Sequence, residues 1–255
     1  MEVVCIGSGN VATHLAKAFK ASGAKLVQVY SPNETHAAAL AAELDSVYTN
    51  DLRQLYRGAD LYLVAVKDDA IPIVVAALTG IEGMVVHTSG ATSITVLEAA
   101  GLNHYGVFYP LQTFSKTRAI DFERIPLCLE ANHPENLQRL KQIAGKLSTM
   151  VYEVSGEQRK ILHLSAVFAC NFVNHLYDLG RGILQEHQLD FELLRPLILE
   201  TAEKVQSALP IEVQTGPAVR GDQETMAKHL ALLENRPDLQ EIYKILSNGI
   251  KKTHI

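Results

Sequence analysis

The sequence predicts an α/β domain built on a mostly parallel, doubly wound sheet, followed by an all-α region. From residue 3 to about residue 109, short β-branched runs alternate with Ala- and Leu-rich stretches of helical character. These runs are apolar on both faces, which is typical of parallel strands that helices cover on both sides. After Ser155 only helical periodicities remain, so the second region is expected to contain no strand.

The elements are expected in the following order. Strands are predicted at residues 3–6, 26–31, 61–66, 84–87 and 105–109, with a weaker one near Val47, and helices lie between them at residues 11–21, 34–44 and 70–78. Two further strands, 125–130 and 150–154, flank a helix at 134–147 that has Pro134 in its first turn. The second region predicts helices at 161–184, 191–209, 224–233 and 239–250. We therefore predict two domains, residues 1–154 and residues 155–255.

Composition excludes several classes of protein. The chain has 255 residues, is 47% hydrophobic and carries a formal net charge of -5, with no Lys/Arg cluster that would favour a nucleic-acid partner. Its three cysteines are odd in number and widely spaced, which suits a reducing compartment. Glu2 lies where an export signal would be positively charged, and the apolar stretches at 70–81 and 164–177 are too short to span a bilayer. We expect a cytoplasmic protein without membrane or nucleic-acid partners.

The most specific motif is a glycine turn that follows the first strand. It fits the pattern GxGxxA, and we predict that its residues bind a dinucleotide: Gly7, Ser8, Gly9, Asn10, Val11 and Ala12. The first glycine permits the tight turn, the second lets the backbone approach a pyrophosphate, and the alanine lets the helix pack closely on the sheet. The helix N-terminus then offers free N–H groups to phosphate. The strand before the motif, the helix after it and the following βα units define a Rossmann domain. A tight turn without a ligand is the structural alternative.

The tip of the second strand should select the cofactor. An Asp or Glu there would bind the ribose hydroxyls of NAD, but the sequence has Ser31 and Asn33, which can donate to a 2′-phosphate. No Arg follows, and Glu34 is near. NADP is therefore favoured over NAD, with helix capping as the structural interpretation of these residues. The ends of later strands add Val66 and Ser89 to the predicted cofactor-binding residues, because ligands lie outside the carboxyl ends of parallel strands.

The chain resembles a known family in several segments. These are GSGNVA, AVKDDAI, HTSG, YPLQTF at 109–114 and the helix LHLSAVFACNFVNHLY. They resemble Rossmann-like proteins with a C-terminal helical domain of unknown function, commonly labelled NADP oxidoreductases. More distantly, the arrangement is similar to pyrroline-5-carboxylate reductases, ketopantoate reductases and deazaflavin-dependent NADP reductases. The resemblance covers nearly the whole chain and implies the fold and cofactor, but not the substrate.

Two departures limit what the resemblance implies about activity. Hydroxyacid dehydrogenases of this broad class carry a catalytic Lys and, four residues later, an Asn on the first helix of the second domain. Here Lys160 is followed at that spacing by Leu164. The Gly-rich substrate loop of pyrroline-5-carboxylate reductases is replaced by residues 215–222. Neither activity is carried over.

Hydride transfer requires a protein to hold the substrate against the nicotinamide and to handle one proton. His163, Cys170 and Asn174 lie near one stripe of a largely apolar helix, where a polar group needs a structural partner or a ligand. Asn171 lies on the flank of that stripe. Arg220 lies in a turn-rich loop and can bind the carboxylate of a substrate. The structural alternative is an ion pair between Arg220 and Asp222 or Glu224. His87 is the second candidate proton donor. We predict that His163, Asn171, Arg220 and His87 share a cleft, and that no metal is bound, because the histidines lack a metal-binding spacing.

Two functions remain open from the residues alone. The first is an NAD(P)-dependent oxidoreductase that reduces a small, anionic carbonyl or imine compound. The second is a noncatalytic dinucleotide-binding protein, either a redox sensor or an assembly subunit. We also predict a homodimer formed through the helical domain, because this region carries more Leu, Ile and Val than about 100 residues can bury alone. In the reductases that the chain resembles, this domain also pairs the subunits.

Overall fold

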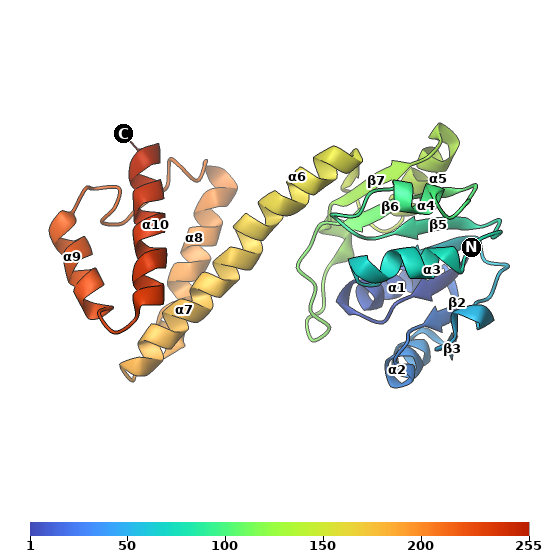
Figure 1. Cartoon of the computed structure of the whole chain (residues 1–255), viewed down its shortest axis with the longest axis horizontal. Coiled ribbons are helices and arrows are strands. Elements are labelled where there is room, and N and C mark those ends of the chain that lie inside the picture. Colours follow the sequence, from blue (N-terminus) through green and yellow to red (C-terminus); the bar gives the residue numbers. More distant parts are fainter. Residues whose placement is uncertain (255) are drawn as a thin grey trace. The chain divides into compact units, whose positions relative to one another are not determined.

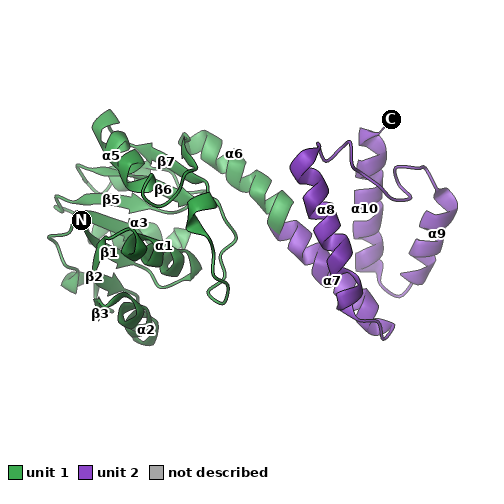
Figure 2. Ribbon diagram, turned by 180° about the vertical axis from the view of Figure 1, so that it is seen from behind, with its two compact units in different colours: residues 1–170 green, residues 171–255 purple. Residues whose placement is uncertain are grey.

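The computed structural model describes residues 1–254 and divides the chain into two compact units, Met1–Cys170 and Asn171–Ile255. Figure 2 colours the two units separately. The predicted domain boundary at 154/155 follows the last strand, which ends at Glu153, whereas the contacts assign the next helix to the first unit. The boundary at 154/155 stays a prediction.

An eight-stranded sheet forms the centre of the first unit (Figure 1). Its strands in chain order are β1 (Glu2–Ile6), β2 (Lys25–Tyr30), β3 (Val47–Thr49), β4 (Leu61–Val64), β5 (Met84–His87), β6 (Tyr105–Pro110), β7 (Leu127–Ala131) and β8 (Val151–Glu153). Their spatial order is β3-β2-β1-β4-β5-β6-β7-β8, and β6 and β7 form the antiparallel pair. The first six strands follow the doubly wound order of a Rossmann domain. The predicted fold class is confirmed.

Helices cover both faces of this sheet. The longer ones are α1 (Asn10–Ala21), α2 (Glu34–Leu44) and α5 (Pro134–Ala144), and the shorter ones are α3 (Ile71–Ala76) and α4 (Thr95–Glu98). A further helix, α6 (Gly156–Ala166), follows β8 and is mostly exposed. Alternation along β1 shows why both faces must be covered. Val3 and Cys5 pack into the core cluster that includes Phe19 of α1, whereas Val4 and Ile6 pack into a second cluster on the opposite face. The short helix α4 was not predicted.

The helix that carries His163 begins earlier than expected. The sequence predicts a start at residue 161, but α6 begins at Gly156 behind a capping box, in which Ser155 and Gln158 bond each other's backbone N–H groups. The helical chain continues through a π-helical segment, Val167–Phe172, into α7 (Val173–Glu186). The earlier start places Arg159 on the same helix face as His163, four residues away.

The second unit is entirely helical within the described residues. Besides α7 it contains α8 (Arg195–Ser207), α9 (Gln223–Leu232) and α10 (Pro237–Thr253). Among residues 171–254, the buried ones are Ala218, Met226 and Leu239. This unit therefore has a very small core of its own.

Candidate functional site

The first turn after β1 requires glycine at position 7 for the fold itself. Gly7 has a φ of +129°, and a Cβ there would lie 2.1 Å from the carbonyl oxygen of Ala65. Ala12 is fully buried and would lie 3.5 Å from that Cβ, so its small side chain permits the close approach of α1 to the sheet. These two residues have the packing roles that the motif assigns to them.

Gly9 is different, because the protein itself does not require a glycine there. Its φ of -75° suits any residue, and a Cβ would meet no atom of residues 1–254 within 4 Å beyond its chain neighbours. It is also the N-cap of α1 and makes no side-chain cap bond, although Ser, Asp or Asn would stabilise that position. The open space above Gly9 and the free N–H groups of α1 fit the pyrophosphate of a dinucleotide.

The tip of β2 lies beside this turn. The hydroxyl of Ser8 donates to the hydroxyl of Ser31 over 2.8 Å, and both side chains are buried. No carboxylate occupies the strand tip. The side chain of Asn33 caps α2 by accepting from the N–H of His36 at 3.0 Å, so the structure shows the capping interaction. A contact between Asn33 and the cofactor stays a prediction.

A pocket of about 770 Å³ opens along the carboxyl ends of the strands. Its lining includes most of the residues predicted to bind the cofactor, namely Gly7, Ser8, Gly9, Asn10, Val11, Ser31, Val66 and Ser89. Ala12 and Asn33 are outside this lining. The charged residues of the lining are Lys67 and Asp68. The amide of Asn10 donates to the carbonyl oxygen of Phe114 over 2.9 Å, which holds the loop after β6 against the start of α1.

His163 belongs to the same pocket as the glycine turn. It lies on α6, and its Nδ1 is 3.0 Å from the phenolic oxygen of Tyr109 at the end of β6. Tyr109 also lines the pocket, and burial is the main cause that raises its pKa to about 12. One pocket thus contains both the glycine turn and a hydrogen-bonded pair of side chains that hold protons.

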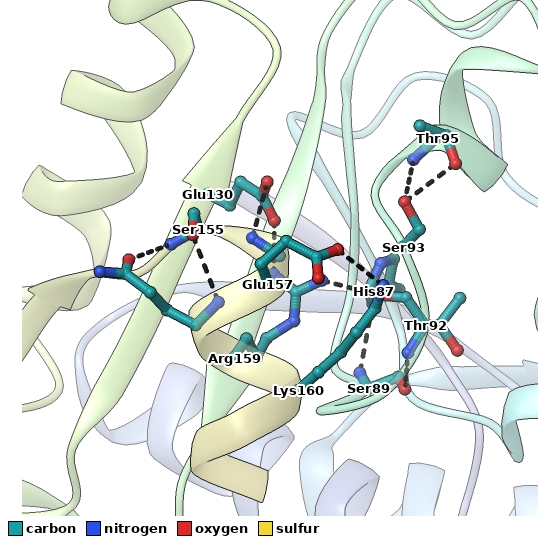
Figure 3. A network of polar contacts seen from close by, with 12 residues as sticks. His87, Ser89, Thr92, Ser93, Thr95, Glu130, Ser155, Glu157, Arg159 and Lys160 are labelled. Carbon is teal, nitrogen blue, oxygen red and sulfur yellow. Dashed lines mark hydrogen bonds and ion pairs between the residues drawn. The ribbon is translucent and has the colours of Figure 1, made fainter.

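A buried ion pair anchors α6 to the sheet (Figure 3). The guanidinium of Arg159 is fully buried and bonds the carboxylate of Glu130 on β7, and it also donates to the carbonyl oxygen of Thr92 over 2.7 Å. Glu130 accepts a further bond, of 3.1 Å, from the N–H of Gly156 at the start of α6. These contacts fix α6 where His163 reaches the pocket.

His87 is unsuited to the predicted role of proton donor. Its side chain is fully buried, is not part of the pocket lining, and its Nδ1 accepts from the N–H of Ser89 at 3.2 Å. Burial and the charge of Arg159 lower its pKa to about 3, so the imidazole is neutral near pH 7 and carries its proton on Nε2. A hydrogen bond with the backbone of Ser93 opposes this lowering of the pKa but is the smallest of the three causes. The geometry therefore favours His163 over His87.

Asn171 and Arg220 belong to the second unit, whereas every residue of the pocket lining belongs to the first. Both side chains are exposed. Asp222, one alternative ion-pair partner of Arg220, caps α9 by accepting from the N–H of Thr225, and Glu224 pairs with Lys228. The roles predicted for Asn171 and Arg220 stay predictions.

The contacts of three residues of this site were missed in the sequence. Tyr109 and Gly90 were recognised as parts of strand ends that face the cofactor crevice, but neither was assigned a contact with His163. Arg159 was not singled out, although the Ser155–Gln158 spacing is a capping-box signal that places it in the first turns of the helix.

Residues 1–254 contain no group of three or more His, Cys, Asp or Glu side chains placed to hold a metal ion. Among the helices of the described chain, none has both the length and the apolar character needed to cross a bilayer.

The fold and the glycine-turn pocket define a dinucleotide-binding Rossmann protein. Family models give the more specific assignment. Residues 2–87 match the model described as NADP oxidoreductase coenzyme F420-dependent, and residues 125–250 match a domain of unknown function, DUF2520. The chain belongs to the NADP oxidoreductase family that joins these two domains. A search of curated proteins finds no match.

Solved structures agree with this assignment. The chain is 44% identical to a "putative NADP oxidoreductase" from Bacteroides fragilis, with a TM-score of 0.94 and 98% of each chain covered. An imine reductase from Myxococcus stipitatus in complex with NADP+ is 16% identical, with a TM-score of 0.67 and coverage of 99% of this chain and 93% of that one. A pyrroline-5-carboxylate reductase from Coxiella burnetii is 19% identical, with a TM-score of 0.59 and coverage of 99% and 98%. The last two share the fold.

Proposed function

We propose that the protein is an NADP(H)-dependent reductase of a small carbonyl or imine compound. The observation that carries this proposal is the pocket itself, which is lined at once by the glycine turn and by the Tyr109–His163 pair. A dinucleotide site alone would fit a binding protein. A proton-holding pair in the same pocket supplies the second requirement of a carbonyl or imine reduction.

The residues of the first unit determine how the cofactor would be held. The N–H groups at the start of α1, above the open space at Gly9, would bind the pyrophosphate. Ser8 and Ser31 would face the adenosine ribose, where a carboxylate would repel a 2′-phosphate, so we favour NADP(H) and keep NAD(H) as the alternative. When bound, the nicotinamide supplies or accepts a hydride.

His163 is the proton-handling group that we assign from its place in the pocket. A neutral or protonated imidazole exchanges a proton near neutral pH more readily than any other side chain. We assign Arg220 to an anionic group of the substrate and Asn171 to its carbonyl or imine. Replacement of either residue should then raise KM while the affinity for NADPH is unchanged.

We further propose that a second copy of the chain covers the helical unit. Within α7 and α8 no described residue is buried, and large apolar side chains are exposed across the unit, including Leu193, Leu197, Leu209, Leu232 and Ile245. A small helical unit with so few buried residues gains its missing core by pairing. Light scattering at micromolar concentration should give twice the chain mass, and a monomer would contradict the pairing.

The three free cysteines suit a cytoplasmic location.

The function is tested by a screen of NADPH and NADH oxidation. Purified protein is mixed with oxo acids, cyclic imines and aldehydes, and cofactor absorbance is followed. Reduction of at least one class, faster with NADPH, is the expected result. Tight NADPH binding without turnover of any acceptor would favour the noncatalytic redox sensor instead, and failure to bind either cofactor would contradict both.

A further inference from the structure

The contact between Tyr109 and His163 joins two segments that lie 54 residues apart in the chain. The phenolic oxygen and Nδ1 are 3.0 Å apart, and the two rings meet edge to face, with centroids 6.1 Å apart and planes at 73°. Both side chains line the pocket that contains the glycine turn. The pair therefore belongs to the same pocket as the predicted pyrophosphate site.

The loop after β5 makes room for this pair. A Cβ at Gly90 would lie 2.8 Å from Cγ and Nδ1 of His163 and 2.9 Å from Cζ of Tyr109, closer than real side chains approach. The backbone of Gly90 does not have a positive φ, so its conformation does not require glycine. The reason for glycine at this position is the space that the two rings occupy.

Tyr109 and His163 differ in their exposure to solvent. Tyr109 is only 8% exposed, and its raised pKa keeps the phenol protonated across the neutral range. His163 is half-buried and lies nearer to solvent. An imidazole is also the side chain best suited to take a proton from water near pH 7. A proton that enters from solvent thus reaches His163 first and Tyr109 second.

We propose that Tyr109 gives the proton directly to the substrate, and that His163 replaces it through Nδ1. This inference rests on the proposed reductase function. The carbonyl or imine carbon gains a hydride from NADPH, and its oxygen or nitrogen gains the phenolic proton of Tyr109. The bond between that oxygen and its hydrogen breaks as Nδ1 of protonated His163 transfers its proton to the same oxygen. Tyr109 ends neutral, His163 ends neutral, and solvent restores the proton of His163.

The pair also has a consequence that needs no substrate. When the imidazole of His163 is neutral, the phenol donates to Nδ1, so the ring proton must lie on Nε2. Nitrogen NMR of labelled protein should show this single tautomer in the wild type. Tyr109→Phe should give a mixture of tautomers, whereas Tyr105→Phe, a buried tyrosine on the same strand, should leave the wild-type pattern. A mixture in the wild type, or an unchanged pattern in Tyr109→Phe, would overturn the pairing in solution.

Steady-state kinetics then tests the order in which Tyr109 and His163 transfer the proton. The substrate is whichever of pyruvate, 1-pyrroline or an aldehyde the wild type reduces fastest. Tyr109→Phe should lower kcat by roughly a hundredfold or more, and added imidazole should not restore it. His163→Ala should lose less, and added imidazole should restore much of its rate, because a soluble imidazole can reprotonate Tyr109. Near-normal turnover by Tyr109→Phe, or a His163→Ala variant that imidazole does not restore, would overturn the order.

Calorimetric titration with NADPH separates the two possible failures. Both variants should bind NADPH as the wild type does. If the wild type binds no NADPH, the reductase function itself fails. If it binds NADPH and reduces an acceptor but shows mixed tautomers of His163, only the Tyr109 inference fails.

Discussion

The buried guanidinium of Arg159 and the carboxylate of Glu130 form an ion pair that ties the first turn of α6 to β7. The Arg159 side chain is 1% exposed and that of Glu130 22%. Glu130 also accepts a hydrogen bond from the N–H of Gly156. The same carboxylate therefore neutralises the buried charge of Arg159 and binds the first residue of α6. His163 follows one turn later, so this pair positions the side chain that we assign to proton transfer.

Removal of either partner should destabilise the protein strongly. We expect Glu130→Ala to lower the free energy of unfolding by about 3 kcal/mol, because it leaves a buried charge without its partner. The double variant Glu130→Leu/Arg159→Met should lose less than the Glu130→Ala variant, since it buries no charge. Urea unfolding of each variant measures these free energies. A double variant that loses as much stability as Glu130→Ala, or more, would contradict this account of the pair.

His87 should make the stability of the protein depend on pH. Its pKa is lowered from 6.5 to about 3 in the folded state, so the unfolded chain binds a proton that the folded protein does not bind. The stabilisation is complete above pH 6.5 and is lost as the pH falls toward 3. Between pH 7 and pH 5 the wild type should lose about 2 kcal/mol from this group.

The matched variant for this prediction is His87→Gln, which cannot titrate. Urea unfolding at pH 7 and at pH 5 gives the loss of stability for each protein. The wild type should lose about 2 kcal/mol more than His87→Gln over this interval. Equal losses would mean that His87 titrates normally in the folded state.

Ser31 should decide between the two cofactors. Ser31→Asp places a carboxylate at the tip of β2 beside Ser8, where it would repel a 2′-phosphate and bind the ribose hydroxyls of NADH. The ratio of NADPH to NADH affinity should fall by roughly tenfold or more, which corresponds to about 1.4 kcal/mol. Asn33→Asp tests the second predicted contact at this strand tip, because an aspartate also caps α2 and leaves the helix start intact. An unchanged ratio in Ser31→Asp would contradict a direct role of Ser31.

The sheet and the glycine turn could be predicted because their signals are local. Each buried strand is a short apolar run, and the motif from Gly7 to Ala12 follows the first run directly. The first and last residues of the helices were predicted less accurately, because several residue types are common both in a helix and in the loop before it. The start of α6 depended on the side-chain bonds between Ser155 and Gln158, which the apolar pattern does not reveal.

The chemistry of the site was only partly predictable, because it depends on contacts between distant segments. The sequence singled out His163, but its partner Tyr109 comes from another strand and is recognised only when β6 and α6 meet. His87 was expected to face the crevice because it ends a parallel strand. Its side chain instead packs in the interior near Arg159, whose charge further lowers its pKa. Burial of that kind is a tertiary property that the pattern of one strand does not show.

The central claim is that NADP(H) binds over Gly9, and calorimetric titration of NADPH into three proteins tests it most directly. Wild type and Gly249→Val, whose new side chain would extend from α10 into open space, should bind NADPH equally. Gly9→Val should remain folded, because no atom of residues 1–254 beyond its chain neighbours lies within 4 Å of the added Cβ, and it should bind no NADPH. Undiminished NADPH affinity in a folded Gly9→Val protein would contradict the account.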